Sequence, residues 1–204
     1  MERIFAPTRD GTHFYVEPLK PDEVNMAAAL CDSCVGENLY PRDYLASTLD
    51  KPDHFFFFLR SRYDEIAGYI YFHTSSFQET AEFLKLSPEE LEKQLGGRPE
   101  QIANMRSISI LEPHRKQNLA RHLLGWGLEY ARSHTGAELA VIVCWKPNGK
   151  VPLKRTVESL NFYYLMDRPK FWYDLPELHC PCCQGRCKCD AAVYVKPLRG
   201  GHNP

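Results

Sequence analysis

Apolar residues recur along the chain with two different periods, and each period predicts a different kind of element. Apolar runs and strict alternation, bounded by glycine, proline and polar clusters, are typical of strands. Apolar positions three or four residues apart, with proline or acidic residues at the start and glycine at the end, are typical of helices. The predicted strands are His13 to Leu19, His54 to Arg60, Ile66 to His73, Arg106 to Leu111, Leu139 to Cys144, Phe162 to Leu165 and Ala191 to Val195. The predicted helices are residues 21–35, Pro41 to Leu49, residues 88–95, residues 119–135 and Leu153 to Leu160.

One connection, residues 74–105, is unusually long for a compact fold. It contains one predicted helix, because Ser87 can cap its start, Pro88 suits the first position and Glu90 completes a capping box. The pair Gly96-Gly97 ends this helix. We therefore expect residues 1–204 to form one domain that carries 74–105 as an inserted helical segment.

The composition is that of an ordinary globular protein, since 44% of the 204 residues are apolar and 25% are charged. A formal net charge of -1 provides no overall field that would attract nucleic acid or a membrane surface. The longest apolar run, Phe55 to Leu59, is too short to span a bilayer. Residues Met1 to Phe5 lack the basic and then apolar order of a secretory signal. We expect a cytoplasmic monomer or homodimer, and favour neither a membrane nor nucleic acid as its partner.

The segment from Ile108 to Gly136 combines an apolar run that stops at Pro113, a basic polar loop and a helix that starts at once. Backbone N–H groups at a helix start lack intrahelical acceptors, and the helix dipole is positive there. Such a helix start binds anions. Arg115, Lys116 and Arg121 add positive side chains, so a ligand that carries phosphate groups is the predicted occupant.

The same loop resembles the signature of the GNAT family of N-acetyltransferases, Arg/Gln-x-x-Gly-x-Gly/Ala. Arg115 and Ala120 match it, while Asn118 replaces the middle glycine. Asparagine is the next best residue where φ is positive, so the loop can keep its shape. The order of the predicted elements is also similar to that family. This resemblance implies an α/β (α+β) GNAT fold, with a mixed central sheet of about seven strands and helices on both faces.

The resemblance further implies that acetyl-CoA is the co-substrate, with its pyrophosphate held by backbone N–H groups of the loop. Asn148, in an Asn-Gly pair after the fifth strand of the family's order, either bonds the cofactor or simply forms a turn. The residues expected at the cofactor are Ile110, Leu111, Arg115, Lys116, Gln117, Asn118, Leu119, Ala120, Arg121 and Asn148.

By the same resemblance, the activity is direct acetyl transfer to a primary amine of a small molecule or a peptide. Many family members protonate the leaving thiolate with a tyrosine of the fourth helix, but the matching residue here is Val157. Tyr163 and Tyr164 lie close by in sequence and are candidates for that role. The alternative is that both are ordinary strand aromatics.

A base is equally hard to identify. Relatives often keep a glutamate on the fourth strand of the family's order, where this chain has Ser107 and Ser109. Ser107, Glu112 just before Pro113, and His73, which titrates in a useful range, are the candidates. The missing tyrosine and base favour an alternative function, a catalytically weak or inactive module that binds CoA for sensing or for contacts with another protein.

Five of the eight cysteines fall within ten residues in the segment 179–190. Thiolates at this density suit a structural Zn²⁺ ion. The candidate ligands are Cys180, Cys182, Cys183, Cys187 and Cys189, with His179 as a replacement for one of them. Redox-sensitive free thiols are the competing interpretation, because disulfides are rare in cytosolic proteins.

This Cys-rich loop lies between the last two predicted strands, next to the aromatic residues Phe171, Trp172 and Tyr173. In the family that connection borders the acceptor-binding mouth, as does the loop between the first two helices. We therefore expect a metal-bound loop, together with the inserted segment, to shape the acceptor site. The identity of the acceptor does not follow from the sequence.

Overall fold

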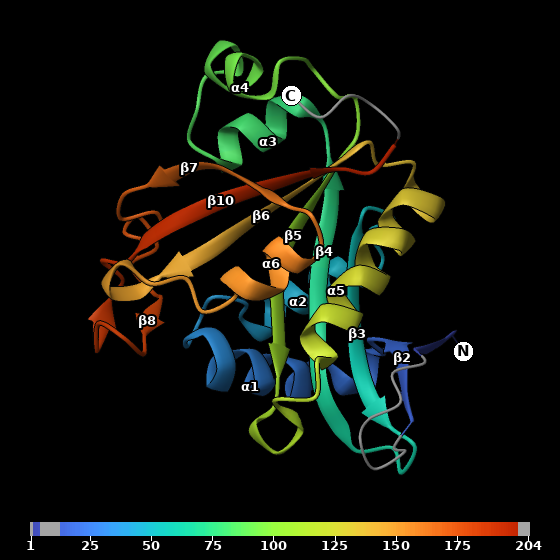
Figure 1. The fold of residues 1–204 in the computed structure, drawn as a ribbon. Helices are drawn as coiled ribbons and strands as arrows, with labels where there is room; N and C mark the ends of the chain where they lie inside the picture. Colours follow the sequence, from blue (N-terminus) through green and yellow to red (C-terminus); the bar gives the residue numbers. More distant parts are fainter. Residues whose placement is uncertain (1, 5–12, 200–204) are drawn as a thin grey trace.

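The computed structural model describes residues 2–4 and 13–199, and its centre is an eight-stranded mixed sheet (Figure 1). The strand order is β1-β2-β3-β4-β5-β6-β10-β7, and only the pair β5–β6 is parallel. These strands are β1 (Glu2–Ile4), β2 (Phe14–Pro18), β3 (His54–Ser61), β4 (Ile66–Ser75), β5 (Ile102–Ile110), β6 (Leu139–Lys146), β7 (Tyr163–Arg168) and β10 (Asp190–Pro197). A separate ribbon in the Cys-rich segment pairs β8 (His179–Cys180) with β9 (Gly185–Arg186).

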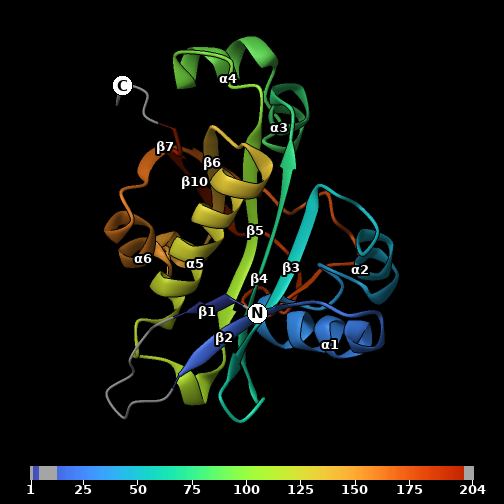
Figure 2. The ribbon, with the colours of Figure 1, turned by 90° about the vertical axis from the view of Figure 1, so that its right-hand side faces the viewer.

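Helices cover both faces of the sheet (Figure 2). The α-helices are α1 (Val24–Val35), α2 (Arg42–Thr48), α3 (Phe77–Phe83), α4 (Pro88–Leu95), α5 (Leu119–Tyr130) and α6 (Lys154–Ser159). Shorter helical turns are η1 (Pro21–Glu23), η2 (Glu112–His114), the π-helical η3 (Ala131–Thr135) and η4 (Pro147–Gly149). In Figure 2, α1, α2 and α3 lie on one side of the sheet, and α5 and α6 lie on the other.

Alternate residues of each strand supply the core of each face. On β4, Ile70 and Phe72 pack into the core under α5, whereas Tyr69 and Tyr71 pack into the core under α1 and α2. A third cluster joins α3 and α4 to β6 and β10. The α5 helix approaches β4 closely at Gly127, where an added Cβ would lie 2.6 Å from the Ile70 Cδ1 atom. The predicted period-two pattern therefore specifies a sheet that is buried on both sides.

The parallel strands β5 and β6 are paired only at their starts. On β5 the pairing runs from Ile102 to Met105, although the strand continues to Ile110. A β-bulge follows immediately, because Arg106 is an extra residue in the ladder between β5 and β4. Bulges bend a strand. Beyond Met105 the two strands part, and the peptide groups of 106–110 that face β6 have no strand partner.

The segment 74–105 is more structured than its sequence pattern predicts. Strands β4 and β5 extend into it, and α4 is the predicted helix, with the Glu90 N–H donating to Ser87 Oγ at 3.2 Å. The pattern misses α3, because seven residues offer only two helical turns, although Ser76 and Glu79 form a capping box there. It also misses the three-residue β1, which is why the sheet has eight strands where about seven were expected.

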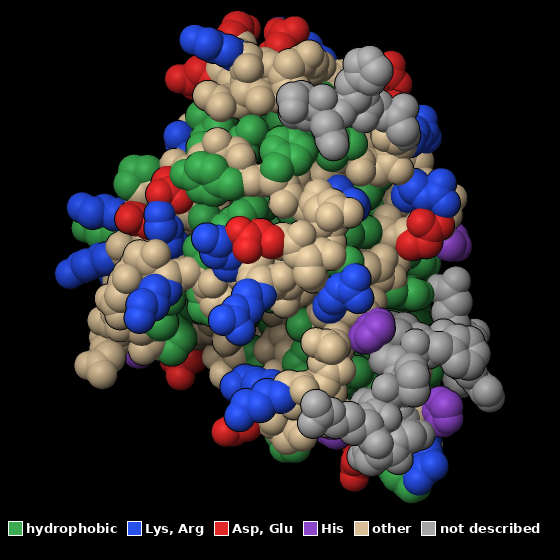
Figure 3. All heavy atoms as spheres, in the orientation of Figure 1, with side chains coloured by type: hydrophobic (Ala, Val, Ile, Leu, Met, Phe, Trp, Pro, Cys, Tyr) green, Lys and Arg blue, Asp and Glu red, His purple; other side chains and the backbone are tan. Residues whose placement is uncertain are grey.

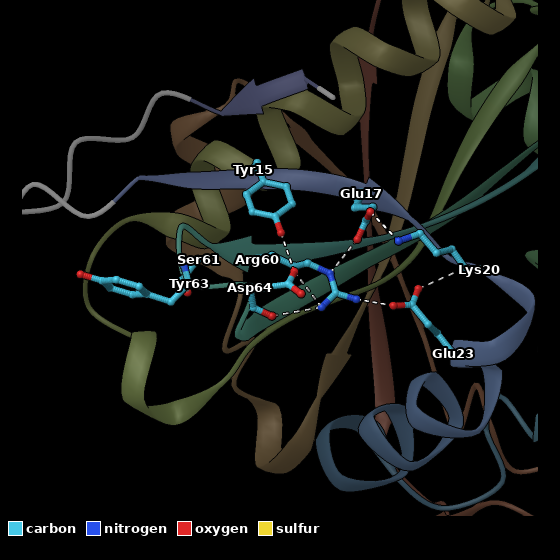
Figure 4. A network of polar contacts seen from close by, with 8 residues as sticks. All are labelled: Tyr15, Glu17, Lys20, Glu23, Arg60, Ser61, Tyr63 and Asp64. Atoms are coloured by element: carbon cyan, nitrogen blue, oxygen red, sulfur yellow. Dashed lines mark hydrogen bonds and ion pairs between the residues drawn. The ribbon is translucent and has the colours of Figure 1, made fainter.

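A buried arginine ties the first strands to the start of α1 (Figure 4). Arg60 of β3 is 6% exposed and forms ion pairs with Glu17 at 2.9 Å, with Glu23, and with Asp64 at 3.4 Å. Tyr15 donates a hydrogen bond to Asp64 at 2.6 Å, which with Arg60 lowers the pKa of that carboxyl. This buried cation therefore has carboxylate partners, as buried charges generally require.

None of the helices in the described part of the chain is both long enough and apolar enough to cross a membrane. Met1 and Phe5, on which the expectation of no secretory signal partly rests, lie outside the described residues.

Candidate functional site

A cavity of about 560 Å³ opens where β5 and β6 part. Ile110, Arg115 and Ala120 line it from the side of α5, whereas Tyr40 and Trp172 line it from the side of α1. The cavity therefore joins the two faces of the sheet.

The loop that precedes α5 has the features of an anion site. Asn118 adopts the left-handed conformation with φ 61°, as the sequence predicts, and α5 begins at the next residue. Lys116 is also left-handed, with φ 64°, which the sequence pattern does not indicate. Arg115 Nε donates to the Ile110 carbonyl oxygen at 2.9 Å and fixes the loop to the end of β5. As at the start of any α-helix, the backbone N–H groups in the first turn of α5 have no intrahelical acceptors.

Positive side chains surround this loop. Figure 3 shows Lys and Arg side chains gathered on the face that carries α5 and α6. Three of them, Arg115, Lys116 and Arg121, belong to the loop and the start of α5, and all three are exposed. Lys154 and Arg155 at the start of α6 are exposed as well. The helix start and these cations suit a ligand with several phosphate groups, so the residues present fit acetyl-CoA.

Most of the residues expected at the cofactor lie in the loop before α5 or in its first turn, which together span residues 111–121. Three of the expected residues line the cavity: Ile110, Arg115 and Ala120. Asn148 does not line the cavity. It lies in η4 with φ 51°, followed by Gly149 with φ 74°, which is a tight turn of two left-handed residues. The structure thus accounts for Asn148 as a turn residue.

Of the catalytic candidates, Ser107 alone lines the cavity. Its hydroxyl lies 2.9 Å from the hydroxyl of Tyr69, whose pKa burial raises well above its usual range. Glu112 is exposed in η2, outside the cavity lining. Tyr163 packs with the cluster under α3, and Tyr164 is 54% exposed against Tyr194 at the sheet edge. The structure does not bring either tyrosine together with Ser107.

His73 also lies outside the cavity lining. Its ring is stacked on His54 with the centroids 5.1 Å apart, and its Nδ1 atom is buried without a hydrogen-bond partner. Burial, and then the charge of Arg106, lower its pKa from 6.5 to about 3. A histidine with so low a pKa is neutral near pH 7, but it is a weak proton acceptor.

Four cysteine sulfurs lie within 4.8 Å of one another in the Cys-rich loop: those of Cys180, Cys183, Cys187 and Cys189. Two of the separations are 3.6 Å, between Cys183 and Cys189, and 3.9 Å, between Cys180 and Cys189. Tetrahedral ligands at a Zn–S distance of about 2.3 Å lie about 3.8 Å apart. The Lys188 N–H donates to Cys183 Sγ at 3.3 Å and lowers the pKa of that thiol.

The remaining ligand candidates lie outside this cluster. Cys182, the alternative to Cys183, is exposed and its sulfur does not belong to the group of four. His179 is exposed too, and it contributes its backbone, since its N–H donates to the Glu37 carbonyl oxygen at 3.0 Å. All eight cysteines are free.

The Cys-rich loop is docked on the connection between α1 and α2. Besides the contact of His179 with Glu37, Asn38 Nδ2 donates to the Glu177 carbonyl oxygen at 3.2 Å. The cysteines pack against Leu39, Trp145 and Trp172, all of which line the cavity. Sequence reasoning missed Leu39 and Trp145 as site residues, because nothing in their local pattern separates them from ordinary core residues.

We compared the chain with known proteins by sequence and by structure. None of the curated proteins matches the chain in sequence. Among solved structures, the NAA60 protein of Arabidopsis thaliana with acetyl-CoA is similar with TM-score 0.68 at 11% identity, over 92% of this chain and 99% of that one. The ribosomal-protein-S18-alanine N-acetyltransferase of Escherichia coli has TM-score 0.61 at 15% identity, over 94% and 98%.

A third similar structure is the spermidine N-acetyltransferase of Vibrio cholerae, a dodecamer, with TM-score 0.61 at 10% identity over 91% of this chain and 94% of that one. At these identities the likeness establishes the fold. Residues 24–150 also match the family model described as the acetyltransferase (GNAT) family. With more than half of the chain matched, and with the loop before α5 and the parted strands inside the matched region, the chain belongs to the GNAT family of acetyltransferases.

Proposed function

We propose that this protein transfers the acetyl group of acetyl-CoA directly to a primary amine of a small molecule or a peptide. The observation that carries the proposal is the cavity between β5 and β6, with an anion-binding loop at its α5 end. A bound acetyl-CoA would supply an activated thioester. The amine would approach from the α1 side, so that both reactants meet in one cavity and proximity provides much of the rate.

The residues of the chain have separable tasks in this reaction. Backbone N–H groups at the start of α5, with Arg115 and Lys116, would hold the phosphates. The peptide groups of 107–109 that face β6 without a strand partner would offer hydrogen bonds to the amide groups of the pantetheine arm. No carboxylate lines the described cavity, and Ser107 is a poor base. We therefore expect the amine to lose its proton to solvent before it attacks, with a rate that rises with pH.

The test of cofactor binding reverses the charge of the loop. Arg115→Glu/Lys116→Glu should weaken the calorimetric affinity for CoA by more than about tenfold, because anionic side chains would face the phosphates at the helix start. A pantetheine fragment without the pyrophosphate should be affected less. Lys51→Glu/Lys93→Glu makes the same charge change at exposed positions outside the loop, and should bind CoA like the wild type.

Two outcomes would revise the proposal. Unchanged affinity in the loop variant would remove the phosphate assignment. CoA binding without turnover of acetyl-CoA, over a broad panel of amines, would favour the alternative function of a sensing or protein-binding module.

We also propose a structural Zn²⁺ ion held by Cys180, Cys183, Cys187 and Cys189. The separations of the four sulfurs support it, as does the small core of the loop, which leaves much of the folding energy to a metal. Four neighbouring thiolates repel one another unless a divalent cation lies between them. The eight free cysteines also support a reducing compartment such as the cytoplasm.

Elemental analysis of protein purified without chelator tests the metal. The wild type should carry about one zinc per chain, and Cys187→Ser/Cys189→Ser should carry none, since two of four ligands are lost. Cys182→Ser is the matched control and should retain the zinc, because the Cys182 side chain is exposed outside the cluster. A metal-free wild type with titratable thiols in this loop would support the redox interpretation instead.

A further inference from the structure

Arg106 is the bulged residue of β5, at the point where β5 and β6 part, and it lines the cavity. Its guanidinium lies over the ring of Phe83 in α3, with Cζ 3.9 Å from the ring centroid. Its Nε atom is buried without a hydrogen-bond partner. Within the described part of the chain, no carboxylate forms an ion pair with it. Phe83 covers one face of the guanidinium, and the neighbouring Tyr40 side chain is uncharged, so the in-plane N–H groups have no anionic partner among the described residues.

Arg60 shows what the same fold does with a buried arginine that has only a structural task. Its guanidinium is enclosed by Glu17, Glu23 and Asp64 (Figure 4). A half-buried cation without such partners is costly, because water is removed from it and nothing replaces the water. We therefore infer that a bound ligand supplies the anion that pairs with Arg106.

The groups around Arg106 cannot provide that anion. Tyr40 donates its hydroxyl to the Arg106 carbonyl oxygen at 3.0 Å, and burial raises the pKa of this tyrosine to about 12. Tyr71 has its hydroxyl 2.7 Å from the Tyr44 hydroxyl and from His54 Nδ1. His54 and His73 both have lowered pKa values, mainly through burial, and stay neutral near pH 7. All of these groups are uncharged beside the arginine.

The position of Arg106 also indicates which ligand would bring the anion. At a strand rise of about 3.3 Å per residue, Arg106 lies roughly 13 Å along β5 from Ile110, where the phosphate-binding loop begins. The phosphates of a bound CoA would therefore lie at the other end of the cavity. Tyr40, which contacts Arg106, lines the cavity from the α1 side together with Val35, Leu39 and Trp172, which form apolar walls. This is the end of the cavity that we assign to the acceptor.

We propose that the acceptor is an amine that also carries a carboxylate, bound by Arg106, and an apolar side chain, packed on the walls formed by Val35, Leu39 and Trp172. This inference rests on the proposed acetyltransferase function. The amine nitrogen would form an amide bond to the acyl carbon while the carbon–sulfur bond breaks, and one amine proton would end on the CoA thiol. Polyamines, which have cations at every amino group, would be rejected by Arg106.

Product binding tests the inference without depending on turnover. Protein saturated with CoA is titrated calorimetrically with N-acetyl-L-phenylalanine and with its carboxamide. The acid should bind about ten- to a hundredfold more tightly, since a charge-assisted pair is lost in the amide. Arg106→Met should abolish this preference, and Arg106→Lys, which keeps the charge but not the paired donors, should keep part of it. Arg132→Gln, at an exposed arginine of η3, should leave the preference unchanged.

The outcomes separate this inference from the proposed function. CoA binding is measured first, and its absence in the wild type would contradict the acetyltransferase itself. CoA binding with equal affinity for the acid and the amide would overturn only the carboxylate assignment. A preference for the acid that persists in Arg106→Met would also overturn the role of Arg106. If that variant does not fold, an undiminished preference in Arg106→Lys, which lacks the paired donors, would have the same meaning.

Discussion

His73 illustrates how one buried side chain couples stability to pH. Its folded pKa of about 3 lies below the value of 6.5 expected for an unfolded chain, because burial and Arg106 disfavour the charged ring. Below pH 6.5 the unfolded chain therefore binds a proton that the folded chain does not. The free energy of unfolding falls as the pH is lowered from 6.5 toward 3, with a limiting slope of about 1.4 kcal/mol per pH unit for this group.

His73→Gln and His73→Phe remove this titration, and both should flatten the dependence of unfolding free energy on pH between about pH 4 and 6. The phenylalanine variant keeps a ring to stack on His54, so a shared flattening would separate titration from packing. Urea unfolding at several pH values gives the measurement. A slope equal to that of the wild type in both variants would show that His73 is not held neutral in the folded state.

Some residues of the candidate site could be predicted from the sequence, and others could not. Asn118 could be identified because it stands where the family signature has its middle glycine, and asparagine tolerates the left-handed conformation that it adopts. Arg106 could not, because its exposure to the cavity depends on a bulge relative to β4 that no local pattern encodes. Cys182 stayed an alternative to Cys183 as a ligand, since spacing alone does not show which sulfurs of a tight loop face one another.

At the scale of elements, most strands and helices were predicted, and the misses are the short elements β1 and α3. The other strands of the central sheet and the helices α1, α2, α4, α5 and α6 follow from hydrophobic period and from the residues at their ends. The seven residues of α3 gain their order from burial of Phe77 and Ala81 against β6 and β10, which is a tertiary effect. The residues of a capping box are present at Ser76 and Glu79, but a box alone does not predict a helix.

The docking of the Cys-rich loop on the α1–α2 connection is a property of two elements together. Gly36 ends α1 with φ 116°, and an added Cβ would lie 3.0 Å from the His179 carbonyl oxygen. A glycine at this position therefore permits both the turn and the close approach of the loop. Because Leu39 follows in the same connection and lines the cavity, the loop holds one wall of the acceptor end in place.

At the scale of the whole molecule, the order of elements was enough to predict the fold, whereas the relation between its parts was not. The cores under α5 and under α1 are large and contain no cysteine of the Cys-rich loop. The core of that loop is small and consists of Leu178 with three of the cysteines, packed against residues of the cavity wall. The main sheet should therefore keep its order when the loop loses a metal, and the cavity wall should not.

Hydrogen exchange with and without chelator tests this division. Metal removal should speed the exchange of backbone amides in 178–189 and in 36–41, because the contacts of His179 with Glu37 and of Asn38 with Glu177 depend on an ordered loop. Amides of β3, β4 and the start of β5 should exchange at unchanged rates. Cys182→Ser with metal should match the wild type. Faster exchange spread evenly over the sheet would mean that the metal stabilises the entire fold, and faster exchange confined to 178–189 would mean that the loop does not hold the acceptor wall.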